Sequence, residues 1–134
     1  MVASIQIAFE SSPFAITLLS KNLSDSKDFY QNKLGLTVVY EDAVSAVFKC
    51  GETMINLLAD SEGPGLLAPA TIAPVTAGTR ALYTLKCADI DKAATELIAA
   101  GVQLLNGPID RPWGVRTLCF LDPSGHVWEL ANHS

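Results

Sequence analysis

The strongest local signal lies in the segment from Arg80 to Gly101, which reads RALYTLKCADIDKAATELIAAG. Its first part, Arg80 to Cys87, is a β-rich run that predicts a strand. From Asp89 to Ala100 the apolar residues recur on one helical face, Asp89 is a favoured N-cap residue, and Gly101 is a favoured C-terminal stop. The segment therefore predicts a strand followed by a capped, amphipathic helix.

Three further strands are predicted after this helix, at Val102 to Leu105, Val115 to Leu121 and Val127 to Ala131. The second half of the chain thus has the order β-α-β-β-β. The first half has the same order, with a strand at Phe14 to Leu19, a helix at Ser24 to Gly35, and strands at Leu36 to Glu41, Val44 to Lys49 and Thr53 to Ala59. A supersecondary unit that occurs twice in one chain indicates an internal duplication.

We therefore expect an α+β fold of two tandem β-α-β-β-β modules, and not a doubly wound α/β sheet. Module one covers about residues 13–59 and module two about residues 80–132. Residues 60–79 form a linker rich in glycine and proline. With 134 residues, the chain is expected to form one domain over residues 1–134.

The amino-acid composition of the chain limits which classes of binding partner we expect. The net charge is −5 with no cluster of Lys or Arg, so we expect no nucleic-acid partner. There is no run of about 18 apolar residues and no secretory signal, so we expect no membrane partner. The cysteines Cys50, Cys87 and Cys119 stand singly in apolar runs and are interpreted as buried free thiols, which favours a cytoplasmic location.

Two motifs add a family resemblance. Residues 23–36 read LSDSKDFYQNKLGL, and residues 122–130 read DPSGHVWEL, an Asp-Pro-x-Gly turn before the last strand. Together with the repeat, they resemble the vicinal-oxygen-chelate superfamily of glyoxalases, bleomycin-resistance proteins and extradiol dioxygenases. The resemblance covers about 120 residues. It implies an open sheet whose two modules line one cleft.

The resemblance also implies four metal-ligand positions, in the first and last strand of each module. Ala15, Asn56 and Leu82 occupy three of them and are not the His or Glu of the metal-dependent members, whereas Glu129 is retained. A protein site for zinc, iron or manganese normally has at least three His, Cys or carboxylate ligands. We therefore expect neither a metal ion nor another cofactor. His126 and His133 are interpreted as surface residues.

Strand alternation from Glu129 places Val127 and Ala131 on the cleft side and Trp128 and Leu130 in the core. Glu129 either contacts a ligand or is held in an ion pair by Arg80, Lys86 or Arg116. Trp113 lies between Pro112 and Gly114, where its ring is expected at the cleft rim rather than in the core. The predicted ligand-binding residues are Thr17, Asn56, Arg80, Leu82, Thr84, Trp113, Arg116 and Glu129.

Three functions remain open at this point. The first is a metal-free protein of the bleomycin-resistance kind, which would confer antibiotic resistance by sequestering a small hydrophobic or aromatic molecule. The second is a lyase, isomerase or dioxygenase-like enzyme with relocated metal ligands, or with acid/base chemistry through the candidate catalytic residue Glu129. The third is a structural or regulatory module. A homodimer is expected, because two modules leave sheet edges to be covered.

Overall fold

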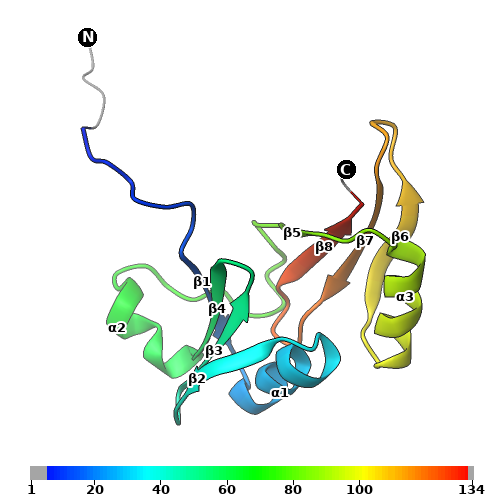
Figure 1. Ribbon diagram of the computed structural model, residues 1–134. Helices are drawn as coiled ribbons and strands as arrows, with labels where there is room; N and C mark the ends of the chain where they lie inside the picture. Colours follow the sequence, from blue (N-terminus) through cyan, green and yellow to red (C-terminus); the bar gives the residue numbers. More distant parts are fainter. Residues whose placement is uncertain (1–5, 133–134) are drawn as a thin grey trace.

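The computed structural model describes residues 6–132 (Figure 1). Module one begins with β1 (Ala15–Ser20) and α1 (Leu23–Asp28), which continues directly into the π-helix η1 (Phe29–Lys33). Its remaining strands are β2 (Thr37–Glu41), β3 (Ser45–Cys50) and β4 (Thr53–Ala59).

Module two repeats this order. It contains β5 (Tyr83–Lys86), α3 (Ile90–Ala99), β6 (Leu104–Asp110), β7 (Arg116–Leu121) and β8 (Val127–Ala131). The connection between the modules holds two short helices, η2 (Asp60–Glu62) and α2 (Pro64–Leu67). Within residues 6–132, none of the helices has the length and apolar character needed to cross a membrane.

Each module forms a four-stranded mixed sheet with the same topology. The strand orders are β1-β4-β3-β2 and β5-β8-β7-β6. The first strand of each module pairs in parallel with the last, and the other pairs are antiparallel. The predicted α+β fold of two tandem β-α-β-β-β modules is confirmed.

Two strands differ in length from the prediction. The fifth strand is predicted to start at Arg80, but β5 starts at Tyr83, where its parallel pairing with Trp128 of β8 begins. The sixth was expected at Val102 to Leu105, but β6 runs on to Asp110 through Gly107 and Pro108. Two shifts in its register with β7 absorb these residues, so the glycine and proline bend the strand instead of ending it.

Both predicted helices form, and in each the side chain of the N-cap residue accepts a hydrogen bond from the backbone N–H three residues later. The side chain of Asp89 accepts a hydrogen bond from the backbone N–H of Lys92, as predicted for this cap. The first helix begins one residue earlier than expected, at Leu23, because Asn22 caps it. Its second half is the wider η1, in which the N–H of Leu34 reaches the carbonyl of Phe29.

One hydrophobic core extends through both modules. The α1–η1 helix lies between the two sheets (Figure 1), and its two aromatic residues contact both of them. The ring of Tyr30 lies 6.0 Å from Phe48 of β3 and 6.2 Å from Trp128 of β8. The ring of Phe29 lies 6.1 Å from Phe120 of β7. Trp128 is 2% exposed, which confirms its predicted place in the core.

Candidate functional site

The sheet faces that point away from the helices carry one polar pair in each module, at matching positions. In module one, Thr17 of β1 lies opposite Asn56 of β4, and Asn56 Nδ2 donates to Thr17 Oγ1 at 3.3 Å. In module two, Thr84 of β5 lies opposite Glu129 of β8, and Thr84 Oγ1 donates to Glu129 Oε1 at 2.9 Å. The duplication therefore extends to a hydrogen-bonded pair, neutral in module one and anionic in module two.

These outer faces do not supply a metal-binding set. The register places threonine hydroxyls, and no imidazole, beside Asn56 and Glu129, so Glu129 is the one carboxylate among the four paired side chains. Within residues 6–132, there is no group of three or more His, Cys, Asp or Glu side chains that could hold a metal ion. The residues present do not fit the metal centre that the fold resemblance implies.

Cys119 of β7 is the third member of the site around Glu129. It lies directly opposite Glu129 on the neighbouring strand and is 7% exposed. Burial raises the pKa of its thiol, and the negative charge of Glu129 raises it further. A hydrogen bond with Asn106 and the charge of Arg111 oppose this shift of the pKa. Cys119 is therefore a neutral thiol near pH 7 and not an activated nucleophile.

Arg111 brings a positive charge to the same face. Its Nε donates to Oγ1 of Thr117 at 2.9 Å, and Thr117 is 1% exposed on the strand that also carries Cys119. Within the described chain, Glu129 forms no ion pair with Arg111 or with any other cation. The face thus offers a carboxylate and a guanidinium around a small, uncharged thiol.

None of the three predicted counter-ions, Arg80, Lys86 and Arg116, pairs with Glu129 within the described chain. Arg116 was a candidate, but its side chain lies on the helix side of the sheet, where it pairs with Asp91 of α3 and with Asp110, each at 2.9 Å. Both carboxylates raise the pKa of Arg116 through hydrogen bonds. Lys86 is exposed at the end of β5, opposite Ala131, and forms no ion pair with Glu129.

The remaining predicted ligand-binding residues fall into two cavities and one turn. Thr17 and Arg80 line a cavity of about 330 Å³ together with the linker. Leu82 and Thr84 line another, of about 300 Å³. Trp113 is 69% exposed in the turn between β6 and β7, so its ring lies outside the core.

Some assignments need correction. His126 is not a free surface residue, because it is partly buried and its Nε2 lies 2.9 Å from the carbonyl oxygen of Leu19 in the other module. His133 lies outside the described residues. Of the three cysteines, which are all free, Cys119 is buried, while Cys50 and Cys87 are only partly buried.

Sequence reasoning missed Cys119 as the neighbour of Glu129, and Asn106 and Arg111 as neighbours of Cys119. For Cys119 a signal was present, because strand alternation can be carried from β8 across to the antiparallel β7 once their register is known. For Asn106 and Arg111 no such signal exists, since the register shifts of β6 decide where these side chains lie.

Comparisons with known proteins agree with this architecture. The model of the Glyoxalase/Bleomycin resistance protein/Dioxygenase superfamily matches residues 13–130. No curated protein matches the chain. Among solved structures, a glyoxalase/bleomycin resistance protein/dioxygenase from Nocardioides is similar at a TM-score of 0.82 and 23% identity, over 95% of this chain and 86% of that one.

Two further structures show the same fold. A lactoylglutathione lyase from Agrobacterium tumefaciens has a TM-score of 0.74 and 22% identity, over 91% of this chain and 93% of its own. A glyoxalase-related enzyme from Fulvimarina pelagi has a TM-score of 0.79 and 20% identity, over 93% and 89%. The family model covers nearly the whole of both modules, and the chain belongs to the Glyoxalase/Bleomycin resistance protein/Dioxygenase superfamily.

Proposed function

We propose that the chain is a metal-free small-molecule-binding protein of the bleomycin-resistance kind. Its ligand would be largely apolar, hydrophobic or aromatic, and would lie on the outer face of the second sheet. The observation that carries this proposal is the state of Glu129, a partly buried carboxylate that accepts a hydrogen bond from Thr84 and has no ion-pair partner in the described chain.

The polar side chains on this face determine which functional group the ligand needs at its polar end. The hydroxyl proton of Thr84 is already directed at Glu129, so a ligand that approaches Glu129 has to donate a proton or carry a positive charge. A charge-assisted hydrogen bond to the carboxylate would be the strongest polar contact available there. Arg111 would serve as a second anchor if the ligand also has an acceptor.

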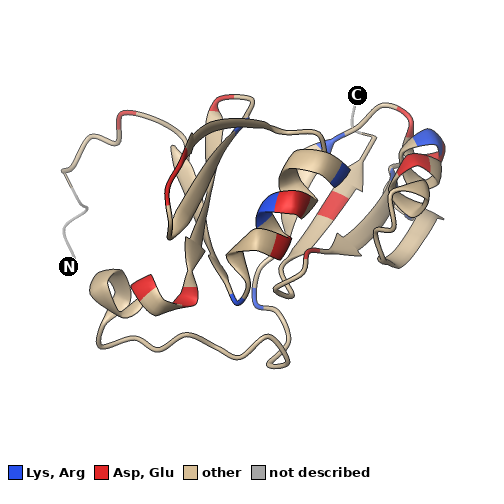
Figure 2. Cartoon of the chain, turned by 90° about the horizontal axis from the view of Figure 1, so that it is seen from below, with Lys and Arg blue, Asp and Glu red and all other residues tan. Residues whose placement is uncertain are grey.

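The apolar part of the ligand would contact Trp113. This ring is exposed in the turn that Gly114 closes with a φ of 93°, beside the strand that carries Cys119. Aromatic stacking contributes on the order of 1 kcal/mol beyond the burial of apolar area. Figure 2 shows that the charged residues gather mostly on helices and turns, which leaves sheet surface for apolar contacts.

We also propose that a second copy of the chain completes the site as a homodimer. Each sheet has two edge strands, and Leu82, next to Thr84 and on the same side of its strand, is 51% exposed. Covering these surfaces would remove apolar area from water and would enclose the ligand.

Acid/base catalysis through Glu129 is a second candidate function. It is favoured by the hydrogen bond from Thr84, which orients one carboxylate oxygen and leaves the other side of the group open to a substrate. A solved structure with the same fold is described as a lactoylglutathione lyase.

The test is a titration with matched aromatic ammonium ions, neutral alcohols and carboxylates, followed by tryptophan fluorescence. We expect the ammonium ions to bind best and Glu129→Gln to weaken them about tenfold, since a hydrogen bond to a charged group contributes ~1.5–3 kcal/mol. Glu52→Gln, at an exposed position between β3 and β4, is the matched control. Equal affinity of Glu129→Gln and wild type for every compound would contradict the proposal.

The metal-free part of the proposal has its own measurement. Purified protein should contain no stoichiometric zinc, iron or manganese after a chelator wash, because Glu129 is the one carboxylate in the two hydrogen-bonded pairs of the outer faces, within the residues that the structure describes. A retained metal that Glu129→Ala releases would contradict this part and favour the enzymatic candidate.

A further inference from the structure

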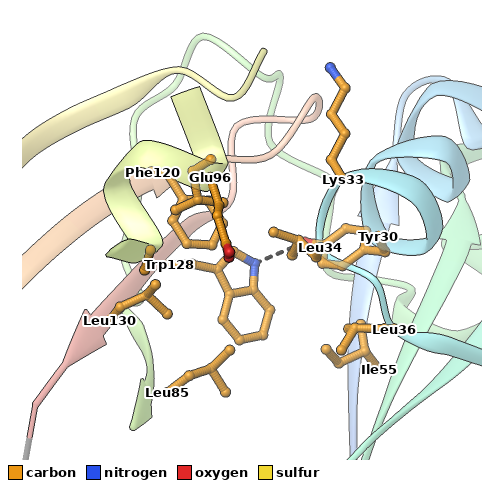
Figure 3. A pocket seen from close by; sticks show the side chains of 12 residues that line it. Tyr30, Lys33, Leu34, Leu36, Ile55, Leu85, Glu96, Phe120, Trp128 and Leu130 are labelled. Carbon is orange, nitrogen blue, oxygen red and sulfur yellow. Dashed lines mark hydrogen bonds between the residues drawn. The ribbon is translucent and has the colours of Figure 1, made fainter. Parts of the chain in front are cut away.

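A third cavity lies on the opposite side of the sheets from Glu129, at the junction of the two modules (Figure 3). Its volume is about 200 Å³, and it opens between η1 of module one and α3 of module two. The residues that line it are Tyr30, Lys33, Leu34, Leu36, Ile55, Leu85, Ala93, Glu96, Leu97, Phe120, Trp128 and Leu130.

The interior of this cavity presents apolar surface and no unsatisfied polar group. The indole Nε1 of Trp128 donates to the hydroxyl of Tyr30 at 2.9 Å, and this hydroxyl donates to Asp122 at 2.7 Å. The other inner walls are aliphatic or aromatic. An apolar cavity without polar partners holds water poorly and favours an apolar guest.

The mouth of the cavity has one charge of each sign. Lys33 belongs to η1 and Glu96 to α3, and neither takes part in an ion pair within residues 6–132. In Figure 3 the Glu96 side chain reaches down over the indole of Trp128, whereas Lys33 extends away from the opening. Lys33 Nζ instead lies against the end of α3, 3.7 Å from where a Cβ on Gly101 would be.

We propose that this cavity is a binding site for a small organic ammonium ion that carries a single ring or a short alkyl chain. The volume sets the size of the apolar part, since a cavity of roughly 150 Å³ accommodates one benzene ring. The carboxylate of Glu96 sets the charge, because it is the ionic group that faces the opening. The ring of the guest would lie against Trp128 and Phe120.

This site is independent of the function proposed above. On β8 it uses Trp128 and Leu130, which face the helices, whereas the proposed ligand site uses Glu129 on the outer face. Occupation of one site therefore does not require occupation of the other.

The experiment uses 2-phenylethylammonium as the probe, with 2-phenylethanol as the neutral comparator. Trp113→Phe serves as the background, so that the fluorescence reports Trp128 alone and the indole of the outer site is removed. We expect saturable binding of the ammonium ion. Glu96→Gln should weaken it about threefold, to the affinity of the alcohol, because an exposed charge pair contributes little.

Ala93→Leu should reduce binding at least tenfold by filling the cavity from α3, where leucine is well tolerated in a helix. Ala99→Leu, at an exposed position of the same helix, is the matched control and should bind like the background. Chemical-shift changes in the amides of Ala93 and Glu96 and in the Trp128 indole would locate the guest in this cavity, separately from any changes at Thr84 and Glu129 that come from the outer site. Undiminished binding in Ala93→Leu, or shifts confined to Glu129 and its neighbours, would overturn the proposal.

Discussion

The hydroxyl of Tyr30 donates a 2.7 Å hydrogen bond to Oδ2 of Asp122, which joins η1 of module one to the Asp-Pro-Ser-Gly turn of module two. The same hydroxyl accepts a hydrogen bond from Trp128 Nε1, and Asp122 also accepts from the backbone N–H groups of Ser124 and His126. The motif that signals the family from sequence is thus one half of a buried contact between the modules.

Replacement of Tyr30 by phenylalanine should destabilise the protein by ~1–3 kcal/mol, because it leaves the Trp128 indole N–H without its buried acceptor and removes the hydrogen bond to Asp122 Oδ2. Urea unfolding followed by circular dichroism measures the change in the free energy of unfolding. Tyr40→Phe removes a hydroxyl that binds an exposed carboxylate, Asp42, and should cost less than about 0.5 kcal/mol. Equal losses in the two variants would show that the buried contact adds nothing.

Alkaline pH should weaken the fold through the same tyrosine. Burial raises the pKa of Tyr30 well above its ordinary value of 10.0, and the charge of Asp122 raises it further. A raised folded-state pKa gives stability that is fully present below pH 10 and is lost above it, because only the unfolded chain then ionises. The expected loss is ~1.4 kcal/mol per pH unit above pH 10. Between pH 9 and 11, the free energy of unfolding should fall less steeply with pH for Tyr30→Phe than for the wild type. Equal slopes for the two proteins would contradict the raised pKa of Tyr30.

Gly107→Ala should be strongly destabilising. Gly107 has a φ of 91°, and an added Cβ would lie 2.6 Å from Leu118 Cα and from the carbonyl oxygen of Thr117. Gly35 has a φ of 74°, and no atom lies within 4 Å of such a Cβ. Gly35→Ala should therefore lower the free energy of unfolding only by the ~1–2 kcal/mol that a left-handed backbone costs a residue with a Cβ. The melting temperatures of the two variants separate the effect of the steric clash at Gly107 from the effect of the positive φ, which both positions share. Similar melting temperatures would mean that β6 moves away from β7 without cost.

Light scattering should give about twice the chain mass of 14.3 kDa at micromolar concentration, if a second copy covers the sheet surfaces as proposed. Leu82→Glu places a charge on the outer face of module two and should shift the protein to the monomer. Leu66→Glu, on α2 away from both sheets, changes charge equally at a 70% exposed position and should leave the mass unchanged. A stable wild-type monomer would contradict the proposed dimer.

The fold was predictable because it depends on local patterns. The β-rich runs Thr53–Ala59 and Val127–Ala131 predict both last strands with their observed bounds, and Asp89 marks the start of the second helix. The bounds of β6 were not predictable, because its continuation past Gly107 and Pro108 depends on pairing with β7. Local residue preferences hold no information on such a partner.

The candidate site was predictable only in part. Glu129 and Thr84 follow from alternation along single strands, and their hydrogen bond follows from the parallel pairing of β5 and β8. Arg116 was misplaced because alternation had to be carried from β8 to β7, where Cys119, and not Arg116, shares the face of Glu129. Arg116 is held on the helix side of the sheet by the carboxylates of Asp91 and Asp110, which belong to two other elements, α3 and β6.

The shared core has a consequence for the history of the chain. The burial of Phe29 and Tyr30 depends in part on β7 and β8 of the other module, whose Phe120 and Trp128 pack against the two rings. A module with such a helix on its own would expose more of both rings to water. Because the linker joins the two modules in one chain, the second module covers the rings without a concentration-dependent assembly. With the pairing guaranteed by the linker, the two halves were free to diverge, and the amide of Asn56 and the carboxylate of Glu129 now mark the same position with different charge.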